Sequence, residues 1–137
     1  MSKIIIGIDP GVKTGFAVWL PHLKKFARIE TMKIHEAMKT IYQLMDYNEL
    51  EVYIEDARLR KWFGPRSRQK LQGAGSVKRD CKIWDDFLKD EGIKYHMVHP
   101  MQGGTKLDKI QFEKITGWNK RTSEHSRDAA MLVFELR

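Results

Sequence analysis

Hydrophobic positions along the chain follow two periods, and each period predicts a different kind of element. Short runs rich in β-branched and aromatic residues are typical of strands, and five occur, at residues 4–8, 14–19, 26–31, 51–55 and 93–98. Apolar residues at three- and four-residue steps are typical of one helix face, and they predict helices over 34–48, 69–90, 107–115 and 126–136. The pattern therefore predicts a fold that contains both strands and helices.

The connections indicate how the strands pair. Pro10-Gly11 and the segment 20–22 are turns short enough to join the first three strands as antiparallel neighbours. The helix at 34–48 is a crossover that brings strand 51–55 parallel to the first strand. The 137 residues contain no internal repeat, low-complexity tract or linker. The chain is thus predicted to be one α/β domain, residues 1–137, with a five-stranded mixed sheet flanked by helices.

Two of the predicted strands end in a carboxylate. Asp9 closes the apolar run at 4–8 and is followed at once by a Pro-Gly turn, and Glu55 closes strand 51–55. If the two strands are parallel neighbours, these side chains lie together at one edge of the sheet. A buried carboxylate without a partner costs several kcal/mol, so this position favours a bound cation.

A third acidic position lies in the segment HSRDAAML near the C-terminus. His125 and Asp128 are three residues apart and share one face of the predicted last helix, while Ala129 and Ala130 allow that helix to approach the sheet closely. Hard oxygen donors with one imidazole suit Mg²⁺ or Mn²⁺. Two such ions about 4 Å apart can activate water and stabilise the leaving oxygen in phosphodiester hydrolysis.

Charge favours a polyanionic partner. Lys and Arg number 25 against 18 Asp and Glu, a formal net charge of +7, although many small proteins are basic without a specific partner. Residues 57–82 hold nine Lys or Arg and one acid, Asp80. Trp62 offers a planar surface for an unstacked base or packs against its own loop. The predicted DNA-binding residues are Arg58, Arg60, Lys61, Trp62, Arg66, Arg68, Lys70, Lys78 and Arg79.

Other positions have structural interpretations. Asp56 alternates to the opposite face from Glu55 and is predicted to pair with a basic side chain. The stripe Val77, Cys81, Trp84 and Leu88 is predicted to pack in the core, with part of it available to a second copy of the chain. The remaining histidines lack an acidic partner at ligand spacing and are expected at the surface or in loops: His22, His35, His96 and His99.

Cysteine content and hydropathy set the expected compartment. Cys81 is the single cysteine, which excludes an internal disulfide and a cysteine zinc cluster. No apolar stretch approaches the roughly 20 residues that span a membrane, and the first residues do not form a signal peptide. We expect a soluble cytoplasmic protein with no membrane partner.

Three segments together carry a family resemblance. IGIDPGVKTGFAV, YIEDAR and HSRDAAM resemble, in order, the catalytic blocks of RuvC-type Holliday junction resolvases, nucleases of the RNase H-like superfamily. The resemblance implies an RNase H-like fold and a homodimer that makes paired symmetric cuts in branched DNA such as four-way junctions. The compact segment GWNKRTSEH is similar to that of a phage or mobile-element relative.

The resemblance also implies roles for individual residues. Asp9 matches the aspartate that bridges two metal ions, Glu55 the glutamate of the fourth strand and Asp128 the helix aspartate. His125 falls where family members carry Asp or His. Lys106, in a Gly-Thr-Lys loop, is the candidate for a lysine that assists near the scissile phosphate, and the alternative candidate is Lys109.

Other functions are consistent with parts of this pattern. A nuclease of the same fold acting on structured RNA would use the same carboxylates. A junction-binding module without catalysis would retain the basic surface. An ATP-using phosphotransferase of the actin and sugar-kinase group also has an early Asp-Gly phosphate loop, but it needs two lobes and a second Gly-rich loop, which 137 residues do not provide.

Overall fold

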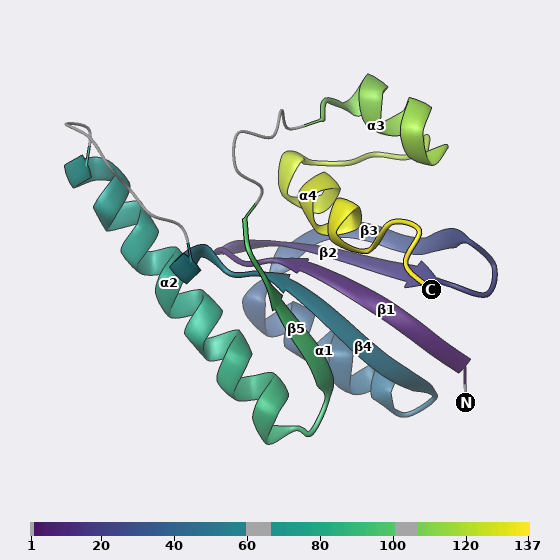
Figure 1. Cartoon of the computed structure of the whole chain (residues 1–137), viewed down its shortest axis with the longest axis horizontal. Coiled ribbons are helices and arrows are strands. Elements are labelled where there is room, and N and C mark those ends of the chain that lie inside the picture. The colour runs from purple at the N-terminus through teal and green to yellow at the C-terminus, as the bar shows by residue number, and fades with distance from the viewer. Residues whose placement is uncertain (1, 60–66, 101–106) are drawn as a thin grey trace.

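The computed structural model describes residues 2–59, 67–100 and 107–137, and for 67–74 the backbone alone. Figure 1 shows one sheet with helices on both faces. The strands are β1 (Ser2–Asp9), β2 (Lys13–Leu20), β3 (Lys25–Lys33), β4 (Asn48–Glu55) and β5 (Lys94–Val98). The helices are α1 (Ile34–Met45), α2 (Ser67–Asp90), α3 (Lys109–Thr116) and α4 (Glu124–Val133), with a 3-10 turn, η1, at Ala57–Leu59.

The sheet has the strand order β3-β2-β1-β4-β5. The first three strands are antiparallel, whereas β4 pairs parallel with β1 and β5 pairs parallel with β4. The β1-α1-β4 crossover therefore exists as predicted. The expected α/β architecture, a five-stranded mixed sheet with its first three strands antiparallel, is confirmed.

Several element boundaries differ from the sequence prediction by a few residues, and two of these differences have a visible cause. The first helix ends at Met45 rather than near Asn48, because Asn48 already belongs to β4 and its side chain donates to the carbonyl of Leu44. The last helix begins at Glu124 rather than residue 126, because Ser123 caps it by accepting from the Ser126 amide.

Alternation along β1 divides the core into two layers. Ile4, Ile6 and Ile8 face α1 and α2, whereas Ile5 faces α4. On α2, Cys81, Trp84 and Leu88 are fully buried and Val77 partly so. The prediction that this stripe packs in the core is confirmed. In the described part of the chain, no helix is long and apolar enough to cross a membrane.

Glycines on the α4 face of the sheet set the position of α4. A Cβ atom at Gly7 would lie 2.1 Å from the carbonyl oxygen of Ala129, and one at Gly15 would lie 2.0 Å from that of His125. Ala129 and Ala130 are fully buried against the same strands. The predicted close approach of this helix is confirmed, and it brings the first turn of α4 over the ends of β1 and β2.

Candidate active site

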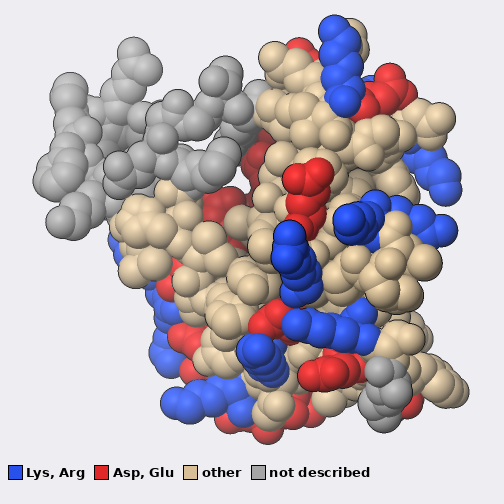
Figure 2. Space-filling model, turned by 45° about the vertical axis from the view of Figure 1, so that its right-hand side comes forward, with Lys and Arg blue, Asp and Glu red and all other residues tan. Residues whose placement is uncertain are grey.

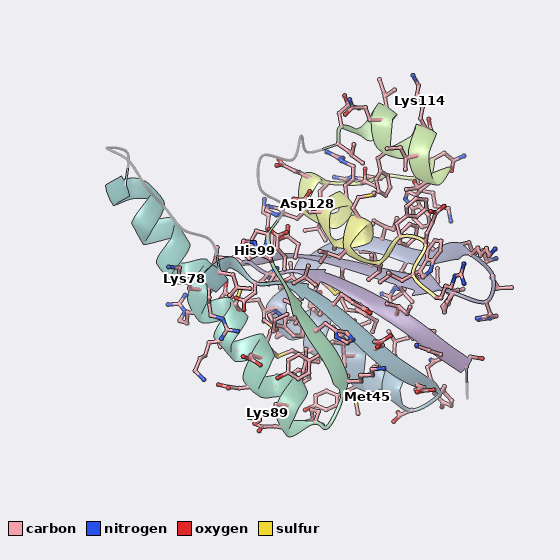
Figure 3. The ribbon with its side chains drawn as sticks, viewed as in Figure 1. Met45, Lys78, Lys89, His99, Lys114 and Asp128 are labelled. Carbon is pink, nitrogen blue, oxygen red and sulfur yellow. The ribbon has the colours of Figure 1, made fainter. Side chains whose placement is uncertain are left out.

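The predicted acidic residues meet at the carboxyl-terminal edge of the central strands. Asp9 is the last residue of β1, and Glu55 is the last residue of the neighbouring parallel strand β4. His125 and Asp128 belong to the first turns of α4, and Figure 3 labels Asp128 at this end of the sheet. The topology thus brings together at one edge residues from β1, β4 and α4 that are far apart in the sequence.

A direct contact joins the sheet to the helix within this group. Nδ1 of His125 lies 3.0 Å from Oδ2 of Asp9. The Asp9 side chain is 14% exposed and that of His125 is 47% exposed, so the carboxylate is recessed while the imidazole faces solvent. The hydrogen bond fixes the orientation of both side chains.

The electrostatics of Asp9 show that the carboxylates interact. Burial raises the pKa of Asp9 to about 6 from its ordinary 3.8, and the hydrogen bond from His125 opposes the rise. The negative charges of Glu55 and Asp128 are part of that rise. Both carboxylates are therefore close enough to repel that of Asp9, an arrangement that a divalent cation relieves.

The donor set fits a hard cation. Carboxylate oxygens with one imidazole nitrogen suit Mg²⁺ or Mn²⁺. Among the described residues, no group of three or more His, Cys, Asp or Glu side chains is arranged so that it could hold a metal ion. The site instead contains the hydrogen-bonded pair Asp9–His125, and the charges of Glu55 and Asp128 lie near it.

A second ionic network holds the chain directly after Glu55. The Asp56 carboxylate, 4% exposed, accepts from Nε and Nη2 of Arg58 at 2.8 and 2.9 Å. Nη2 of Arg58 also donates to Asp85 on α2 at 3.0 Å, and the Tyr95 hydroxyl donates to Asp85 at 2.5 Å. The prediction that Asp56 pairs with a basic side chain is confirmed, and the network ties β4, α2 and β5 together.

The predicted DNA-binding residues differ in whether their side chains are paired, exposed or outside the described residues. The guanidinium of Arg58 is engaged by two carboxylates, whereas Lys78 is half-buried and Arg79 exposed on α2. Figure 3 labels Lys78 on α2 on the same side of the view as His99. Arg60, Lys61, Trp62, Arg66 and Lys106 lie outside the described residues, as do the side chains of Arg68 and Lys70.

The structure also contains a cluster that the sequence prediction missed. Glu51, 6% exposed, lies on the same face of β4 as Glu55. It contacts Lys3 at 3.2 Å, Lys94 at 2.9 Å and His96 at 3.0 Å. No acidic partner for His96 was found at ligand spacing in the sequence, and the structure pairs it with Glu51 across two strands. The sequence pattern that could have revealed this cluster is the alternation of Glu51, Tyr53 and Glu55, which places all three on one face of β4.

Comparisons with known proteins support the fold. No protein-family model and no curated protein matches the chain. Among solved structures, the chain is similar to T. thermophilus RuvC, whose structure was determined in complex with a Holliday junction substrate. The two are 19% identical, with a TM-score of 0.57, over 97% of this chain and 91% of that one. This likeness shows that the chain has a RuvC-like fold.

Proposed function

We propose that this protein is a divalent-metal-dependent endonuclease that incises branched DNA and resolves Holliday junctions by paired symmetric cuts. The observation that carries the proposal is the convergence of Asp9, Glu55 and Asp128 where β1 and β4 end beside α4, with His125 in hydrogen-bond contact with Asp9. The convergence occurs at one sheet edge in a fold shared with T. thermophilus RuvC, which was solved with a Holliday junction substrate.

Asp9, Glu55, His125 and Asp128 are the proposed metal-binding residues. When bound, Mg²⁺ or Mn²⁺ would activate water and stabilise the leaving oxygen of the phosphodiester. The hydrogen bond between Asp9 and Nδ1 of His125 orients the carboxylate and leaves Nε2 as the ring nitrogen suited to ligation. The recessed position of Asp9 limits its access to bulk water, which strengthens its electrostatic interactions.

Charge supplies the attraction to DNA in this proposal. The formal net charge is +7, and Arg79 is exposed on α2. Figure 2 shows other Lys and Arg side chains in blue, mixed with red Asp and Glu, over the face it presents. Phosphate contacts release counterions, so affinity is expected to fall steeply with salt.

Paired cuts require two active sites on one junction. A four-way junction has an approximate two-fold axis, and an isologous dimer presents two identical sites related by such an axis. The homodimer is therefore part of the proposal. Sedimentation or light scattering at the protein concentration used for cleavage tests it directly.

The decisive assay measures cleavage of end-labelled four-way junctions, flaps and linear duplex with Mg²⁺ or Mn²⁺. Wild type is expected to cut junctions in opposed strands, and Asp9→Asn is expected to lose cutting while retaining junction binding. Asp46→Asn is the control, because Asp46 follows α1 at the opposite end of β4 and its loss leaves the site intact. Unchanged cutting by Asp9→Asn would contradict the assignment.

Two further results would redirect the proposal. Tight junction binding without cleavage under any divalent metal would indicate a non-catalytic binding module. Preferential cleavage of structured RNA over DNA junctions of the same shape would keep the chemistry and change the substrate. Equal-length RNA and DNA four-way junctions in direct competition distinguish the latter case.

A further inference from the structure

The α4 side of the sheet is only partly covered. In the described chain, α4 packs on β1, β2, β3 and β4, and β5 is the edge strand beyond them. Figure 1 looks at this side and shows α4 over β1 and β2, with β5 as the last strand of the sheet and α2 running beside it. Strand residues that alternate toward this side form rows across β1, β4 and β5.

Three rows lead away from the candidate active site. The first contains Glu55 beside Val98, the second contains Gly7, Tyr53 and His96, and the third contains Ile5, Glu51 and Lys94. Two residues of strand separate consecutive rows, which corresponds to about 7 Å. That spacing suits one unstacked nucleotide per row.

The second row presents an aromatic surface at the edge of the sheet. The rings of Tyr53 and His96 stack with centroids 4.5 Å apart and planes 25° apart. Tyr53 therefore covers one face of the imidazole, and the His96 side chain is still 41% exposed. Because β5 is the edge strand, no further strand of the described sheet lies beyond His96.

The third row and the row beyond it, which contains Lys3 and Glu49, present cations held by ion pairs. Lys94, with a side chain 67% exposed, and Lys3, 37% exposed, both contact the Glu51 carboxylate. The hydrogen bond from His96, together with those from the two lysines, lowers the pKa of Glu51 to about 2, so that it stays ionised. Glu49 lies opposite Lys3 and its charge also acts on Lys94, so the cluster balances two lysines against two carboxylates. Each ammonium has three donors, and contact with Glu51 leaves donors for a phosphate.

We propose that this surface binds the unpaired DNA strand next to the scissile phosphate. The base one nucleotide from the cut stacks on the open face of His96, with Tyr53 behind it, and the following phosphate contacts Lys94 and Lys3. Stacking is tolerant of sequence because every base has a π face. The inference rests on the proposed junction cleavage and adds the path of the cleaved strand.

The test measures junction binding in EDTA by fluorescence anisotropy, so that no cleavage occurs. Abasic nucleotides replace, one at a time, the two positions on each side of the cut. The variants are His96→Ala, His96→Phe and Lys94→Glu. Lys25→Glu is the charge control, because Lys25 lies in β3 at the opposite edge of the sheet. Circular dichroism establishes that each variant is folded.

At one of the four positions, the loss of affinity caused by His96→Ala should depend on whether the base is present. His96→Ala is expected to weaken binding of the intact junction about 5-fold or more and to have no effect on the junction that is abasic there. His96→Phe should bind both junctions as wild type does. Lys94→Glu should weaken binding about 10-fold at low salt, and Lys25→Glu less than about 2-fold.

The outcomes separate this inference from the proposed function. If wild type cuts junctions but His96→Ala and the abasic changes act independently at all four positions, the strand path is wrong and the proposed function stands. Equal effects of Lys94→Glu and Lys25→Glu would also overturn the path, because the charge would then act without a specific contact. If wild type neither binds nor cuts branched DNA, both proposals fail.

Discussion

Replacing Asp9 by asparagine is expected to stabilise the protein while abolishing its chemistry. Asp9 is recessed beside two other carboxylates, so its ionised form is unfavourable in the folded chain. Asparagine has nearly the same shape, carries no charge and can still accept a hydrogen bond from Nδ1 of His125. The variant therefore removes the electrostatic cost and retains the contact.

The size of the stability gain and its pH dependence follow from the pKa of Asp9. A carboxyl group whose pKa is 3.8 in the unfolded chain and about 6 in the folded one costs about 3 kcal/mol when fully ionised. Between these values the folded state binds more protons, so stability falls as pH rises from 4 to 6. Asp9→Asn should thus gain about 3 kcal/mol above pH 6 and little at pH 4.

Chemical denaturation in EDTA at pH 4, 6 and 8 measures this gain. Asp56→Asn is the control, because Asp56 is buried but paired with Arg58. That substitution weakens a charge-assisted contact and should destabilise by about 1–3 kcal/mol. An Asp9→Asn variant that is less stable than wild type at pH 8, or whose gain is the same at pH 4 and pH 8, would refute the reasoning.

Other consequences are open to simple measurements. Gly15→Ala should destabilise by about 1–3 kcal/mol in urea unfolding, because its Cβ would meet the His125 carbonyl, whereas Gly75→Ala, with open space around it in α2, should stabilise by about 0.5–1 kcal/mol. Glu51→Gln should destabilise the protein by about 1–3 kcal/mol at pH 7. The difference should vanish toward pH 2, because Glu51 is protonated there and no longer stabilises the folded state as a carboxylate. Millimolar Mg²⁺ should raise the melting temperature of wild type but not of Asp9→Asn, since only ligand bound to the folded state stabilises it.

The pairing of β1 with β2 and β4, and with it the position of Asp9 and Glu55, was predictable because local patterns set both, whereas the place of β5 was not predicted. An apolar β-branched run ending in a carboxylate, a crossover helix and a second such run are enough to place two acids side by side. The position of α4 was predictable from the small residues Ala129 and Ala130, although its close approach also depends on Gly7 and Gly15 across from it.

The Glu51 cluster was not predicted, because it depends on contacts between three strands. Lys3, Glu51 and Lys94 are far apart in the sequence, and they meet only through the parallel registers of β4 with β1 and β5. The partner of His96 was missed for the same reason, since a search along the sequence for acidic residues at ligand spacing does not detect pairing across strands.

Cleavage of a supercoiled plasmid that extrudes a cruciform tests the central claim most directly. With Mg²⁺, wild type should convert the circle to a linear product, since two opposed cuts are made at one junction, and Asp9→Asn should leave the circle intact. A nicked circle as the final product, or linearisation by both proteins alike, would contradict the account.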